Sequence, residues 1–169
     1  MLIQKSSTEP NIDLTKLFDD GVHFINTSQW VLAYAAFANL YQSNKKKSVA
    51  VLYNMALCYY SAKEYTKATS VLVEALTQID MPSISYQSNS NLPSELLKHE
   101  YENNPYRFAL NETAVELNND LVKLRIRRLL VDVQLALQNW QEIIRLSALP
   151  DMDKCKNVQE ALTISKSNT

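Results

Sequence analysis

Hydrophobic and polar positions follow the same order twice in the first half of the chain. A small residue, Gly21 or Ala56, is followed three positions later by an aromatic residue, and a short polar break comes next. A further aromatic residue, Trp30 or Tyr65, then opens a second segment, and an alanine follows three positions after it. This order is typical of two helices joined by a turn, so it predicts two consecutive helix pairs.

A single offset relates the two copies. Six residues of the second copy each lie 35 positions after their counterparts in the first. The pairs are Gly21 and Ala56, Phe24 and Tyr59, Trp30 and Tyr65, Ala33 and Ala68, Phe37 and Leu72, and Leu40 and Ala75. We expect the small residues to let two helices approach closely and the aromatic residues to fill the wider gap. Because one such pair cannot bury its apolar face alone, neighbouring pairs are expected to stack.

These residues resemble the tetratricopeptide repeat family, whose pattern runs Leu-Gly, Tyr, Ala, Phe, Ala and a closing proline about 34 residues along. The copy at about residues 49–82 is the more similar, with Met55-Ala56, Tyr59, Tyr65, Ala68, Leu72 and Ala75 at the matching places. The copy at about residues 14–47 ends on Lys45-Lys46-Lys47 where the family has its proline. The resemblance implies an all-α fold, a right-handed α-solenoid of antiparallel helix pairs.

Residues 83–110 interrupt the repeats. Prolines and many serines and asparagines predict a loop-rich insert that holds one short helix over residues 94–101, with Ser94 as its N-cap. A connection of this length usually has a role or is disordered. We expect residues 83–108 to lie along the groove or rim of the helix stack.

The last part of the chain predicts a third, degenerate helix pair over about residues 112–150. Its apolar positions mostly follow alternating steps of three and four, which predicts one long helix from about Asn111. These positions are Leu110, Ala114, Leu117, Leu121, Leu124, Val131 and Leu135. Trp140 then opens a further helix, and a closing helix over residues 155–166 is expected to cap the stack. The prediction is thus a single domain over residues 12–166, after an extended or disordered segment at residues 1–11.

Composition excludes several classes of site. The 169 residues include one glycine, whereas a phosphate-binding loop, a dinucleotide fingerprint and a nucleophile elbow each need two or more. His23, His99, Cys58 and Cys155 fall into no metal-ligand spacing. We therefore expect no enzymatic activity, no cofactor, no metal and no small-molecule substrate.

The charge pattern bears on location and on large partners. A formal net charge of −1 gives no overall attraction to nucleic acid or to an anionic membrane. No secretory signal is expected from residues 1–11, and no apolar run is long enough to span a bilayer, so a cytoplasmic protein is predicted. The alternative of a nucleic-acid-associated accessory protein rests on Lys45-Lys46-Lys47 and on Arg125, Arg127 and Arg128.

The resemblance implies that the first helix of each pair lines a concave groove for an extended peptide or a helix. The groove candidates are Phe18, Val22, Ile25, Tyr53, Asn54, Leu57, Tyr60, Arg125 and Arg128. This set predicts an adaptor or scaffold whose partner is another protein, held by apolar side chains with an acidic residue facing Arg125 or Arg128.

Three alternatives stay open at the level of sequence. The chain also resembles secretion chaperones built from three such repeats. It could form a homo-oligomer through the long helix. Finally, residues 83–108 could themselves pack on Tyr53 and Tyr60, which would then bind nothing outside the chain.

Overall fold

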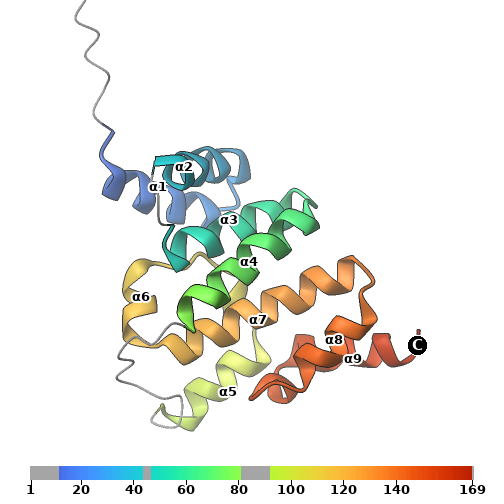
Figure 1. Cartoon of the computed structure of the whole chain (residues 1–169). Coiled ribbons are helices and arrows are strands. Elements are labelled where there is room, and N and C mark those ends of the chain that lie inside the picture. Colours follow the sequence, from blue (N-terminus) through green and yellow to red (C-terminus); the bar gives the residue numbers. More distant parts are fainter. Residues whose placement is uncertain (1–11, 44–46, 81–91, 169) are drawn as a thin grey trace, which may run out of the picture.

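The structure, a computed structural model, describes residues 12–43, 47–80 and 92–168. Within these ranges the chain forms helices joined by turns and contains no strand (Figure 1). The all-α prediction is therefore confirmed for this part of the chain. Residues 1–11 and residues 83–91 of the insert lie outside the described residues. None of the described helices is long and apolar enough to cross a membrane.

The first four helices pack in chain order. The elements are α1 (Leu14–Asn26), α2 (Trp30–Ser43), α3 (Val49–Ser61), α4 (Tyr65–Ile79), α5 (Ser94–Glu102), the short 3-10 helix η2 (Pro105–Arg107), α6 (Glu112–Leu117), α7 (Asn119–Ala136), α8 (Trp140–Ser147), the short 3-10 helix η3 (Met152–Lys154) and α9 (Lys156–Lys166). Helices α1, α2 and α3 each contact the next helix in the chain, and α4 packs along α7. Helix α7 in turn contacts α8, α9 and η2, so it lies at the centre of the C-terminal part (Figure 1).

Three turns share one backbone arrangement, and each joins the two helices of a pair. Ser28, Lys63 and Gln138 all adopt left-handed conformations, with φ of 59°, 61° and 56°. In each turn, three consecutive backbone amides donate hydrogen bonds to carbonyls of the preceding helix. The amide before the left-handed residue bonds to the carbonyl four residues back, and the amide of the left-handed residue bonds three residues back. The amide after it bonds five residues back. These nine bonds are 2.8–3.1 Å long. The first two turns keep the 35-residue offset seen in the sequence, and the third places α7 and α8 in the same local arrangement.

The repeated turn leads to a prediction about stability. Left-handed backbone costs a residue with a Cβ about 1 kcal/mol or more, and glycine removes that cost. Replacing Gln138 with glycine is therefore expected to raise the free energy of unfolding by up to about 1 kcal/mol. Gln141→Gly is the matched control. Gln141 is exposed, and glycine inside α8 should lower the free energy of unfolding by about 1 kcal/mol. Urea unfolding of both variants measures the difference, and a loss of stability in both would contradict the turn assignment.

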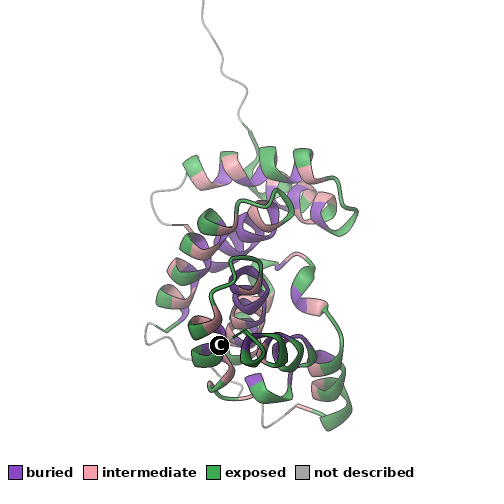
Figure 2. Ribbon diagram, turned by 90° about the vertical axis from the view of Figure 1, so that its right-hand side faces the viewer, coloured by how far each residue is buried: buried purple, intermediate pink, exposed green. Residues whose placement is uncertain are grey.

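Gly21 sets the distance between α1 and α2. A Cβ atom added there would lie 2.8 Å from Cε2 of Phe37, a residue with no exposed surface. The Phe37 ring meets Phe18 edge to face, with ring centroids 5.6 Å apart. The expectation that this glycine allows close approach is thus confirmed. Buried residues lie where the helices face one another and exposed residues on the outer sides (Figure 2).

Two sequence expectations about helix boundaries are wrong. The long helix from Asn111 is two helices, because Asn118 is extended (φ −155°) and its side chain accepts a hydrogen bond of 3.0 Å from the Leu121 amide. Asparagine favours this N-cap role over a place inside a helix. Ser94 is the first residue of α5 and not its N-cap, which is Pro93.

Candidate functional site

The groove residues predicted in the first pair are mostly part of the core. Phe18 and Ile25 are 9% and 3% exposed, and Val22 is half-buried. Phe18 packs on Phe37 from α2. Among these three residues, Phe18 is the one that also lines an open pocket, described below.

The groove residues predicted in the second pair are covered more completely. Tyr53 and Asn54 have no exposed surface and Leu57 is 3% exposed. Tyr60 is half-buried, and its ring lies 5.8 Å from that of Tyr65. Another segment of the same chain covers Tyr53 and Asn54.

Residues 105–111, which we call the inner strap, lie against α3. The Tyr53 hydroxyl donates a hydrogen bond to the Tyr106 carbonyl. The Asn54 side chain pairs with the backbone of Leu110 in both directions, donating to its carbonyl at 2.7 Å and accepting from its amide at 2.8 Å. The Ala109 amide donates to Asn26 Oδ1 at the end of α1, at 2.9 Å. Of the part of the insert that was expected to line the groove, Tyr106 lies against α3 through its bond with Tyr53, so this contact occupies a predicted groove residue.

The strap is held on its other side by a buried polar cluster. The Tyr106 hydroxyl donates to Asp132 Oδ2 at 2.7 Å, and Arg107 Nη2 donates to the same oxygen at 2.7 Å. Asn157 of α9 donates to the other oxygen, Asp132 Oδ1, at 2.9 Å. Burial raises the pKa of Tyr106, and the nearby Asp132 carboxylate raises it further. The strap is thus fixed between α3 on one side and α7 and α9 on the other.

The arginines predicted at the basic end of the groove hold α5. Arg125 Nε and Nη2 donate to the two oxygens of Glu100 at 2.7 and 2.9 Å. Burial lowers the pKa of Arg125, but the hydrogen bonds and charge of Glu100 outweigh that effect and raise it overall.

Arg128, which was predicted to face the groove, has no exposed surface. Its guanidinium donates to the carbonyls of Glu100 and Asn103 at the end of α5, and Nε donates to Asn157 Oδ1 at 2.8 Å. It also lies 4.1 Å from the Tyr106 ring centroid. An acidic residue of a partner would have to replace these groups to reach Arg125 or Arg128.

An open pocket of about 350 Å³ remains beside the strap. We call it the α1–α6 pocket, and it is lined by Leu14, Thr15, Phe18, Asp19, Leu40, Ser48, Val51, Asn111, Glu112 and Thr113. It is therefore built from α1, α2, the start of α3 and the start of α6. The helix N-caps fix its walls: Asp13 accepts from the Thr15 amide at 3.0 Å, and Asn111 accepts from the Ala114 amide at 2.8 Å.

The pocket combines an apolar floor with acidic edges. Phe18, Leu40 and Val51 are the buried residues of its lining, whereas Asp19 and Glu112 are exposed. Ser48 Oγ donates to Glu112 Oε1 at 2.5 Å. Within the described ranges, neither carboxylate forms an ion pair with a lysine or arginine. The pocket therefore suits an apolar side chain that is followed by a positive charge.

Little in the sequence pointed to this pocket. The one available signal was the groove candidate Phe18, which Asp19 directly follows in the sequence. Ser48 and Glu112 lie 64 positions apart, so no local pattern connects them.

The two cysteines lie in the described part of the chain, and neither is placed as a reactive thiol. Cys58 and Cys155 are both buried free thiols, and burial raises their pKa to about 12 and about 11. Neither supplies much thiolate near neutral pH. No cluster of three or more histidines, cysteines and carboxylates forms among the described residues.

Comparison with known proteins adds no relative. No protein-family model, no curated protein and no solved structure matches the chain.

Proposed function

We propose that the protein is an adaptor or scaffold with a tetratricopeptide-like arrangement of helix pairs, which binds a peptide or helix of another protein on its concave side. The open α1–α6 pocket carries this proposal. The three repeated turns support the arrangement, because each joins two helices in the same way. The strap supports the use of this side for binding, because the Asn54 side chain of α3 already holds the backbone of one chain segment at Leu110 through two hydrogen bonds.

The pocket defines the chemistry of the bound segment. Its floor accepts a leucine-sized or aromatic side chain, and its edge places Asp19 and Glu112 beside the entrance. Carboxylates at this edge favour a neighbouring lysine or arginine and disfavour an acidic residue. The partner segment should therefore contain an apolar residue next to a lysine or arginine.

Selection from a library of short random peptides displayed on phage tests this function. We expect enriched peptides to share an aromatic or aliphatic residue adjacent to Lys or Arg. The double variant Asp19→Asn and Glu112→Gln removes both charges and keeps the shape of the pocket. It should weaken the selected peptides by about 10-fold or more in fluorescence anisotropy.

The matched control is Asp153→Asn with Glu160→Gln, which makes the same change of charge at exposed positions outside the pocket. It should leave binding unchanged at an ionic strength of about 0.15 M, where charges more than about 8 Å apart are largely screened. Enrichment of acidic peptides, no enrichment, or equal weakening by the two double variants would each overturn the proposal.

A further inference from the structure

Helix α2 is uncharged along its whole length although much of it faces outward. Its 14 residues, WVLAYAAFANLYQS, include no Asp, Glu, Lys or Arg. A helix that is apolar on all sides is normally buried. Here Val31 is 83% exposed, and Leu32 and Tyr34 are each 47% exposed. By comparison α9 exposes Lys156 and Glu160, as is usual for a helix that faces water.

The outer face of α2 has the relief that a second helix needs. Val31, Ala35 and Ala38 follow steps of four and three, so they form one line along the helix. The two alanines leave a shallow track, and Tyr34 and Tyr41 stand along one side of it. Tyr34 is held there by the Tyr59 ring of α3, with centroids 6.1 Å apart. Small residues flanked by fixed large ones let the ridge of another helix approach closely.

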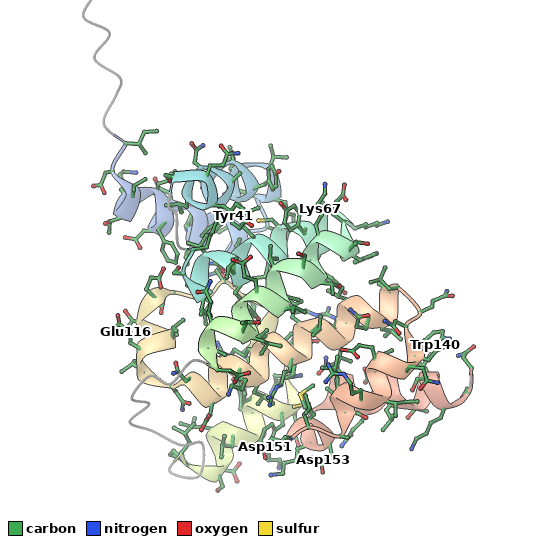
Figure 3. All side chains as sticks on the ribbon, viewed as in Figure 1. Tyr41, Lys67, Glu116, Trp140, Asp151 and Asp153 are labelled. Carbon is green, nitrogen blue, oxygen red and sulfur yellow. The ribbon has the colours of Figure 1, made fainter. Side chains whose placement is uncertain are left out.

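Lysines stand on the same side as the tyrosines. Lys47 Nζ lies 4.5 Å from the centroid of the Tyr41 ring, and Lys67 Nζ lies 5.8 Å from that of Tyr59. Tyr41 on α2 and Lys67 on α4 both belong to the N-terminal four helices (Figure 3). Lys67 also forms an ion pair with Glu64 at 3.4 Å, whereas Lys47 forms no ion pair among the described residues. Lys47 is therefore the basic group at this edge of the apolar track that an acidic side chain of a partner can pair with, and Lys67 would share its pairing with Glu64.

We propose that the outer face of α2 docks an amphipathic helix of another protein, with apolar side chains over Val31, Ala35 and Ala38 and acidic side chains facing Lys47 and Lys67. This surface is separate from the α1–α6 pocket, so one chain can hold two partners at once.

Charge and shape select this occupant over two others. A second copy of the chain would bring another uncharged α2 to the same face, and that helix has no carboxylate to offer the lysines. A membrane surface requires large side chains that insert into lipid. The centre of this face is alanine, and the tyrosines beside it are already held by ring and lysine contacts.

A display library of amphipathic helices, with apolar and charged positions both varied, tests the proposal on the full chain. We expect the enriched helices to be acidic along one edge. Val31→Asp with Ala35→Asp should weaken them by about 10-fold or more, as should Lys47→Glu with Lys67→Glu. Leu117→Asp is the control, because Leu117 is an exposed apolar residue on α6 (64% exposed, against 83% for Val31) and its substitution should leave binding unchanged.

The other outcomes all count against the proposal. One such outcome is enrichment of basic helices, and another is no enrichment at all. A third is enrichment of acidic helices whose binding is not weakened by the α2 substitutions. Sedimentation as a dimer that Ala35→Asp dissociates would assign the face to a second copy, and pelleting with phosphatidylserine vesicles that Val31→Asp abolishes would assign it to a membrane. Thermal unfolding confirms that each variant is folded. The pocket variant Asp19→Asn with Glu112→Gln should not alter helix binding, which separates failure here from failure of the peptide-binding function.

Discussion

Replacing Arg128 with methionine is expected to lower the free energy of unfolding by about 3–5 kcal/mol. The side chain is fully buried, and its guanidinium satisfies two carbonyls at the end of α5 together with the Asn157 side chain. A positive charge at a helix C-terminus also interacts favourably with the helix dipole. Methionine has a similar length but donates no hydrogen bond, so these three acceptors would lose their partner inside the protein. Urea unfolding followed by circular dichroism measures the change.

Arg145→Met provides the matched control for this substitution. Arg145 pairs with Glu142 on the surface of α8, and the Arg145 side chain is 61% exposed. Exposed pairs of this kind contribute at most about 1 kcal/mol. If the Arg128 and Arg145 variants lose similar amounts of stability, the buried cluster does not hold α5 as described.

The second large effect is expected at Asn54. Asn54→Leu keeps the volume of the side chain but removes both hydrogen bonds to the Leu110 backbone. The Leu110 amide and carbonyl would then be buried without partners, at about 1–3 kcal/mol for each group. We expect a loss of about 2–4 kcal/mol in total. Hydrogen exchange of the Leu110 amide should also become much faster, because this bond protects it.

Asn39→Leu separates the loss of the strap from a general effect of the substitution. Asn39 is exposed on α2, and its side chain bonds only to the Ala35 carbonyl of the same helix among the described residues. Stability should change by about 0.5 kcal/mol or less. Unchanged protection of the Leu110 amide in the Asn54 variant would show that other contacts hold the strap.

The sequence was informative where packing is local. Small and aromatic residues at one offset predicted the first two helix pairs, and the same turn recurs at Ser28 and Lys63 in the structure. Trp140 marked the start of α8 in the same way. These features depend on neighbours a few positions apart, which a periodic pattern can show.

The buried polar groups could not be predicted in that way, because their partners are distant in sequence. Tyr53 and Asn54 meet residues 53 and 56 positions later. One local signal did exist for Arg128, since it occupies the gap between Leu124 and Val131 in the apolar stripe of α7. A charged residue at a core position indicates a buried partner, whereas the prediction placed this side chain in an open groove.

The inner strap acts as an intramolecular ligand for α3, and this affects how any outside ligand of that helix would be measured. A peptide directed at Tyr53 and Asn54 binds only those molecules whose strap has detached. If about 1% of molecules are in that state, the measured Kd is about 100-fold weaker than the intrinsic one. A substitution that loosens the strap would therefore strengthen such binding even while it lowers stability.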